Sequence, residues 1–129
     1  MRNAREASIE QAVRLKCKEH ELLTYKLEAR SITGFPDRVI IHPAGWVVFL
    51  ELKTDKGKVS ERQKRIHSDL RAYGQTVIVT HGRAEAEAVV AAIAQLPAKS
   101  PTAVHSVLSG ALVETWIRQN APRNMANGG

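Results

Sequence analysis

Two acidic residues and a lysine lie on two neighbouring segments that both have the character of strands. Asp37 follows Pro36 at the start of one apolar stretch, and Glu51 and Lys53 end the next one. Two converging carboxylates form a hard, oxygen-rich site that suits Mg²⁺ or Mn²⁺, and the backbone carbonyl of Leu52 is a further candidate ligand. Because side chains on a strand repeat every second residue, Glu51 and Lys53 should project from the same face.

Such a cluster has the composition needed to hydrolyse a phosphate ester. A divalent ion would polarise the phosphoryl group and lower the pKa of a water, and Lys53 could orient that water or stabilise charge on the phosphate. The same residues allow a simpler interpretation, in which Glu51 and Lys53 form a salt bridge and Asp37 is a turn residue. Residue chemistry alone leaves both interpretations open.

The composition bounds the class of protein. The chain has 129 residues and 43% hydrophobic content, which favours one compact domain with an ordinary core. Its net charge of +6 suits a phosphate-rich partner, because each neutralised phosphate releases counterions. Basic charge alone is weak support for that partner, since many small domains carry it for solubility.

Several classes of site and location are disfavoured. No apolar run approaches the roughly 18–20 residues that span a bilayer, and the polar N-terminus lacks a secretory signal, so we expect a soluble cytoplasmic protein. The single cysteine, Cys17, cannot form an internal disulfide and is interpreted as a small apolar residue of a helix. The five histidines are scattered without zinc-ligand spacing.

Hydrophobic periodicity predicts a mixed α/β domain built on a central sheet. The Pro43-Ala44-Gly45 turn predicts that the strands on either side of it pair antiparallel. The second of these strands is apolar on both faces until its charged end, which predicts a central position in the sheet. The expected elements are a helix over 3–20, strands over 22–28, 37–42 and 46–53, a helix over 60–73, a strand over 75–80 and a helix over 83–96.

Two of the predicted helices carry polar residues of interest. On the first, apolar Ile9, Ala12, Val13 and Leu15 are expected to face the core. Glu6 and Glu10 are one turn apart on a shared face, and spacing does not decide whether they are solvated or direct a metal.

On the helix over 60–73, Ser60 has the character of an N-cap and Gln63 stands at the capping-box position. The apolar side chains expected to face inward are Ile66, Leu70 and Tyr73.

Five short motifs stand in order along the chain. They are E-x-x-I-E (Glu6 to Glu10), G-x-P-D (Gly34 to Asp37), F-x-E-x-K (Phe49 to Lys53), G-K-x-S-x-x-Q (Gly57 to Gln63) and L-x-x-x-G (Leu70 to Gly74). Together they resemble the VRR-NUC family of the PD-(D/E)XK nuclease superfamily, in particular its stand-alone phage and bacterial members. The resemblance covers roughly residues 5–95, nearly the whole predicted core.

The resemblance implies a restriction-endonuclease-like αβββαβ core and Mg²⁺- or Mn²⁺-dependent phosphodiester hydrolysis. Asp37 and Glu51 would be metal ligands together with the Leu52 carbonyl, Lys53 the catalytic lysine and Gln63 a supporting site residue. For the acid of the first helix, the match favours Glu10 as a catalytic and metal-directing residue, with Glu6 second.

The resemblance also implies a nuclease domain over residues 1–96 and a kind of partner. Residues 97–129 lie outside it, and their composition and apolar spacing predict a linker, a short helix over 104–118 and a flexible tail. Family members of this kind imply a homodimer that acts on branched DNA, as a Holliday-junction resolvase does. Expected DNA contacts are Lys26, Lys56, Lys58 and Arg62.

Two other functions stay open at this point. One is a flap- or exonuclease-type activity with the same chemistry. The other is a non-catalytic DNA-binding module of the same fold, although pure phosphate binding would be helped by losing the acidic residues that this chain keeps.

Overall fold

The computed structural model describes residues 4–28 and 31–97 of the chain. The predicted order of helices and strands is confirmed over this part. In chain order the elements are α1 (Ala4–Glu19), β1 (Leu23–Lys26), β2 (Arg38–Ile41), β3 (Val47–Lys53), α2 (Glu61–Ala72), β4 (Thr76–His81) and α3 (Gly82–Ala94). The expected helix over 104–118 lies outside the described residues.

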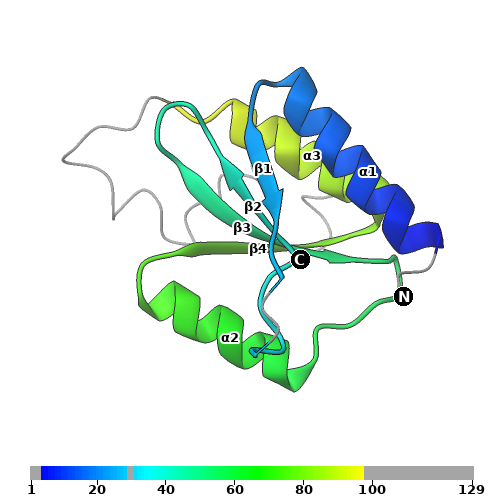
Figure 1. The fold of residues 1–129 in the computed structure, drawn as a ribbon, viewed down its shortest axis with the longest axis vertical. Helices are drawn as coiled ribbons and strands as arrows, with labels where there is room; N and C mark the ends of the chain where they lie inside the picture. The colour runs from blue at the N-terminus through cyan, green and yellow to red at the C-terminus, as the bar shows by residue number, and fades with distance from the viewer. Residues whose placement is uncertain (1–3, 29–30, 98–129) are drawn as a thin grey trace.

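The strands form one mixed sheet in the order β1-β2-β3-β4 (Figure 1). The first three strands pair antiparallel, and β4 pairs parallel to β3. This arrangement confirms the predicted hairpin between β2 and β3 and the central position of β3. Because parallel neighbours need a crossover connection, α2 links the end of β3 to the start of β4.

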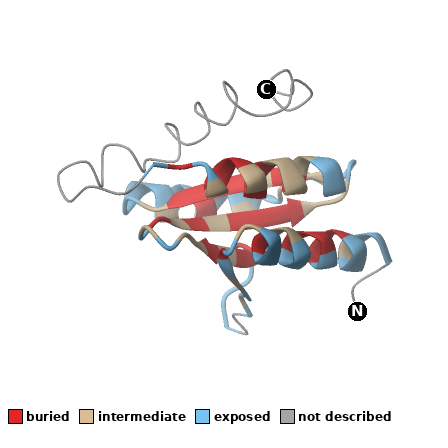
Figure 2. Ribbon diagram, turned by 90° about the horizontal axis from the view of Figure 1, so that it is seen from above, coloured by how far each residue is buried: buried red, intermediate tan, exposed pale blue. Residues whose placement is uncertain are grey.

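Helices cover both faces of the sheet. In Figures 1 and 2, α1 and α3 lie side by side across one face, and α2 crosses the opposite face. The main apolar core lies between the sheet and the α1–α3 pair, and its fully buried members include Val13 of α1, Val48 and Leu50 of β3, and Val90 of α3. The opposite side of the sheet holds the Glu51 side chain, which contacts α2.

The two faces of β3 differ as its sequence requires. Leu50 and Leu52 belong to the apolar core with α1 and α3, whereas Glu51 contacts side chains of α2. The two-residue period of a strand produces this separation. One strand thus contributes to the core with one face and carries charge at the end of the other face.

Two apolar side chains expected in the core are exposed. Tyr73 is 86% exposed, because it is the C-cap of α2 and no longer follows the helical path. Leu15 is 57% exposed, since α1 turns Ile9, Val13 and Cys17 toward the sheet and Leu15 lies off that face. The first strand is also shorter than expected, spanning Leu23–Lys26 rather than residues 22–28.

Cys17 is fully buried in the core, as its interpretation as an apolar residue requires. Burial raises the pKa of its thiol from 9.0 to about 11, against the opposing effects of the nearby Arg38 charge and a hydrogen bond with Thr24. The thiol therefore stays protonated at neutral pH, and a buried protonated thiol is a poor nucleophile.

Across residues 4–28 and 31–97, no helix is long and apolar enough to cross a membrane.

Candidate active site

The loop before β2 is held against α2 and sets the position of Asp37. Gly34 has a φ of 92°, and a Cβ built there would lie 3.2 Å from backbone atoms of Arg62. Glycine therefore allows both the turn and the close approach to α2. The Phe35 ring packs edge-on against Phe49 of β3, with centroids 5.9 Å apart, so the chain enters β2 from a fixed point over the sheet.

Asp37 is tied to the end of β3 through its side chain. The Leu52 backbone N–H donates a hydrogen bond to Asp37 Oδ2 at 2.7 Å. The Asp37 carbonyl accepts a bond from the Leu27 N–H at 2.8 Å, which continues the β1–β2 pairing. The expected meeting of Asp37 with the Glu51–Lys53 strand end is therefore present in the structure.

Glu51 is a buried carboxylate with both oxygens occupied from α2. The residue is only 1% exposed. Its Oε1 lies 3.1 Å from Nε2 of His67, and its Oε2 accepts a bond from Nε2 of Gln63 at 3.2 Å. An ionised carboxylate only accepts hydrogen bonds, so an ionised Glu51 takes this contact from a protonated Nε2 of His67. The side chain is therefore held by α2 through both carboxylate oxygens.

Lys53 projects on the same side as Glu51. Its Nζ lies 3.9 Å from Glu51 Oε2, and its side chain is 18% exposed. The salt bridge of the simpler interpretation is therefore present, but at the edge of the distance range. The ammonium group also lines a cavity, where a substrate could contact it.

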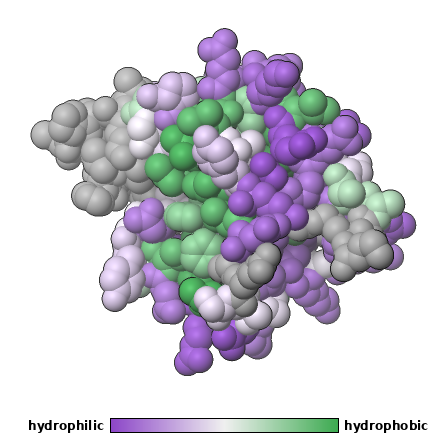
Figure 3. Space-filling view, viewed as in Figure 1, coloured by the Kyte–Doolittle hydropathy of each residue, from purple (hydrophilic) through white to green (hydrophobic). Residues whose placement is uncertain are grey.

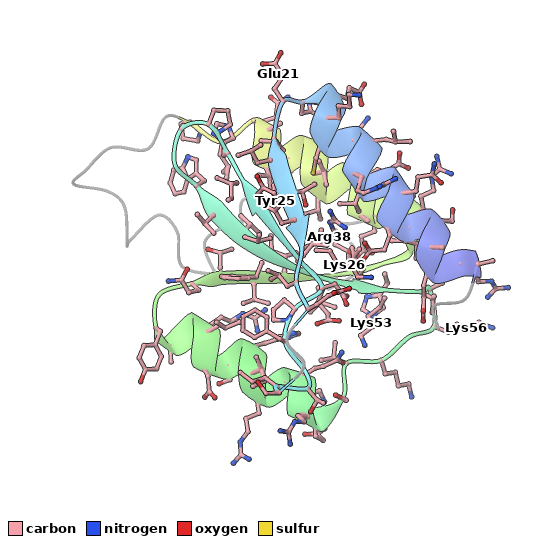
Figure 4. All side chains as sticks on the ribbon, in the orientation of Figure 1. Glu21, Tyr25, Lys26, Arg38, Lys53 and Lys56 are labelled. Carbon is pink, nitrogen blue, oxygen red and sulfur yellow. The ribbon has the colours of Figure 1, made fainter. Side chains whose placement is uncertain are left out.

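A cavity of about 540 Å³ joins these residues. Figure 3 shows hydrophilic side chains gathered on this part of the surface, and Figure 4 shows Lys26 and Lys53 where the sheet edge meets the loop that follows β3. Three basic side chains and three carboxylates give the cavity a mixed charge. Its lining residues are Glu6, Lys26, Asp37, Glu51, Leu52, Lys53, Thr54, Gly57, Lys58 and Gln63.

The two acidic residues of α1 have different positions. Glu6 lines the cavity. Glu10 lies away from its wall, where its Oε2 accepts a hydrogen bond from Nη1 of Arg38 at 2.6 Å. Arg38 also donates from Nε to Thr24 Oγ1 at 3.0 Å. The structure thus brings Glu6, rather than the favoured Glu10, to the other predicted site residues.

The buried Glu10–Arg38 pair should contribute mainly to stability. Replacement of Arg38 by leucine leaves the Glu10 carboxylate without its guanidinium partner, and breaking a buried pair from one side costs about 3–5 kcal/mol. We expect the free energy of unfolding, measured by urea denaturation, to fall by that amount.

Two further variants separate this effect from the loss of any ion pair. Lys16→Ala breaks the more exposed Lys16–Glu19 pair and should lower the free energy of unfolding far less, because solvent screens that pair. The double variant Glu10→Leu/Arg38→Leu should recover most of the stability, since an apolar pair can replace a buried ion pair. Equal losses in Arg38→Leu and Lys16→Ala would contradict this role.

The predicted DNA contacts occupy three places. Lys26 and Lys58 line the cavity that also contains Asp37, Glu51 and Lys53. Lys56 lines a neighbouring hollow of about 680 Å³, together with Arg5, Asp55 and Arg83. Arg62 lies on the outer side of α2, and its Nε donates to the Thr33 carbonyl at 3.2 Å, which gives it a structural contact as well.

His67 is the site residue that sequence reasoning missed. It is the buried side chain of α2 and is 2% exposed. Its spacing held a signal, because residues four apart share a helix face and His67 follows Gln63 by that interval. Zinc-ligand spacing, the criterion applied to the histidines, does not detect a histidine whose partner is a carboxylate, here Glu51.

The donor set fits a hard divalent cation. Asp37 and Glu51 supply carboxylate oxygens at one cavity, and Mg²⁺ is commonly held by one or two carboxylates, with waters and substrate phosphate completing its shell. In the described part of the chain, no three His, Cys, Asp or Glu side chains gather into a metal-binding group. A site with two carboxylate ligands does not need a third carboxylate. Leu52, whose backbone carbonyl is the further candidate ligand, lines the same cavity.

Comparison with known proteins found a similar fold and a similar sequence. The fold matches a solved structure described as a VRR_NUC domain with a TM-score of 0.63 at 23% identity, over 69% of this chain and 97% of that one. The chain is also 35% identical over 79 residues to "Putative nuclease p44" of Acyrthosiphon pisum secondary endosymbiont phage 1, covering 61% of this chain and 85% of the phage protein. No family model matches the chain.

The fold is a restriction-endonuclease-like α/β fold, and the sequence relative is described as a nuclease. Within that class, the chain belongs to the VRR-NUC family. The family resemblance of the sequence motifs is thereby confirmed.

Proposed function

We propose that the protein is a Mg²⁺- or Mn²⁺-dependent DNA endonuclease that acts on branched DNA. The observation that carries the proposal is the convergence of Asp37, Glu51 and Lys53 on one cavity. Membership of a nuclease family supports the same reaction class. The basic residues of the cavity and of the neighbouring hollow suit a polyanionic substrate.

Each residue has a role in this proposal. Asp37 and Glu51 would hold the ion, with the Leu52 carbonyl as a further ligand, and the ion would supply Lewis-acid stabilisation of the phosphate. Lys53 would donate to the attacking water or to a phosphate oxygen, where a positive charge stabilises the developing negative charge. The water oxygen forms a bond to phosphorus as its proton passes to solvent, and the bond from phosphorus to the leaving sugar oxygen breaks as that oxygen takes up a proton from solvent.

The helix-1 acid is assigned differently from the sequence prediction. We propose Glu6 for this role, because it lines the cavity, whereas the Glu10 carboxylate is bonded to Arg38. A carboxylate on the cavity wall can contact an ion through a water. Lys26 and Lys58, on the same wall, would contact the phosphates on either side of the scissile bond.

The central experiment measures cleavage as a function of the metal and of DNA structure. Purified protein is incubated with a labelled four-way junction and with a linear duplex of matched sequence, in Mg²⁺, Mn²⁺ or EDTA. We expect cleavage in either metal, none in EDTA, and paired symmetric nicks at the junction. The Glu51→Gln variant, prepared in parallel, reveals any contaminating nuclease.

The alternatives predict different products. Equal cleavage of linear and branched DNA would contradict the proposed selectivity for branched DNA but would still support a nuclease. Release of flaps or of terminal nucleotides would indicate the flap- or exonuclease-type activity. Salt-sensitive binding without metal-dependent cleavage would contradict the catalytic proposal and favour a binding module. Solution mass, measured by light scattering, tests the homodimer that paired nicks require.

A further inference from the structure

Helix α2 holds the Glu51 carboxylate from one side with two residues. Gln63 and His67 lie one turn apart, so their side chains leave the helix on the same face. Gln63 Nε2 contacts one oxygen of Glu51, and His67 Nε2 contacts the other, at 3.2 and 3.1 Å. The plane of the carboxylate is therefore fixed by two points on a rigid element.

The start of α2 also fixes which way the Gln63 amide points. Gln63 Oε1 accepts a hydrogen bond from the Ser60 N–H at 2.9 Å, as one half of the capping box. Because the amide oxygen is held there, the amide NH₂ group is directed toward Glu51. The amide of Gln63 thus has two roles: its oxygen caps the helix, and its NH₂ group contacts Glu51.

His67 does not cap the helix. It is buried at a position where an apolar residue would be enough for packing. Its side chain and that of Glu51 are each 2% exposed. Burying a ring nitrogen and a carboxylate is costly unless they are hydrogen-bonded to each other. An apolar residue at position 67 would leave the packing of α2 similar but would free Oε1 to reorient.

We propose that His67 is a positioning residue, whose Nε2–H holds Glu51 Oε1 so that the carboxylate is oriented for the divalent ion. This inference rests on the metal-dependent function proposed above. Partners that orient a ligating carboxylate in this way commonly change metal affinity about 10–100-fold when they are removed. His67 does not line the cavity, so it would act through Glu51 and not by its own contact with the DNA or the ion.

The test is the affinity for Mn²⁺ without DNA, measured from the electron paramagnetic resonance signal of free Mn²⁺. We expect His67→Leu to weaken Mn²⁺ binding about 10–100-fold. His67→Gln should bind close to wild type, because the amide nitrogen of glutamine reaches about as far as the imidazole Nε2. His67→Asn, with the same amide on a shorter side chain, should not restore affinity.

Two controls separate positioning from packing. Leu70→Ala removes a half-buried side chain of the same helix, at a position without a hydrogen bond to Glu51, and should leave Mn²⁺ affinity unchanged. Urea denaturation in EDTA shows that each variant is folded.

The outcomes distinguish this inference from the proposed function. If wild type binds Mn²⁺ and His67→Leu binds it equally well, or if His67→Gln and His67→Leu are equally weak, the positioning role is wrong and the nuclease proposal stands. If wild type and all variants fail to bind Mn²⁺, both proposals are overturned.

Discussion

Replacement of Asp37 by asparagine is expected to abolish DNA cleavage while the protein stays folded. Asparagine is nearly isosteric, and its Oδ1 can still accept the Leu52 N–H that now bonds to Asp37 Oδ2. The substitution therefore keeps the contact between β2 and β3 and removes one proposed anionic ligand from the cavity. Loss of an ion that contributes several kcal/mol to the transition state corresponds to about a thousandfold or more in rate.

Three measurements check this expectation. Single-turnover cleavage of the preferred DNA gives the change in rate, and Mn²⁺ titration without DNA should show weaker binding. Urea denaturation in EDTA should give a free energy of unfolding within about 1 kcal/mol of wild type, because one hydrogen bond is exchanged for another. Cleavage by Asp37→Asn at the wild-type rate would remove Asp37 from the site.

Replacement of Lys53 by methionine should separate chemistry from metal binding. Methionine keeps much of the apolar stem and removes the ammonium group, which lines the cavity and lies 3.9 Å from Glu51 Oε2. Cleavage should fall about 10²–10⁴-fold, the usual contribution of a positioned proton-transfer or charge-stabilising group. Mn²⁺ affinity should be equal to wild type or higher, since a positive charge has left the neighbourhood of the ion.

A second lysine supplies the matched control. Lys64 is an exposed residue of α2 paired with Glu61, and Lys64→Met removes the same charge from the chain at a site outside the cavity. It should leave the cleavage rate nearly unchanged. If both variants lose similar activity, the effect of Lys53 is a general one of net charge and the catalytic assignment fails.

Local sequence patterns predicted most of the fold. Alternation along β3 and the short turn before it specified an antiparallel pair, and the capping box from Ser60 to Gln63 marked the start of α2. The errors lie where periodicity stops being informative. Tyr73 fits the apolar stripe of α2 by counting, but the helix ends before it, so the counted position no longer faces the sheet.

The site was predictable where its residues share a strand and less so where two elements meet. Glu51 and Lys53 belong to one strand, and their common face follows from its period. Whether Glu6 or Glu10 reaches the cavity depends on how α1 crosses the sheet and on the Arg38 partner from β2. The contact between His67 and Glu51 likewise depends on the docking of α2, which no spacing within one element encodes.

The two faces of β3, one in the apolar core and one ending in Glu51 and Lys53, make the domain sensitive to strand slippage. A shift of one residue against β2 would turn Glu51 and Lys53 into the core and Leu50 and Leu52 toward α2. The hydrogen bond from the Leu52 N–H to Asp37 forms only in the native alignment. The same carboxylate that is proposed to bind the ion therefore also stabilises the native strand pairing.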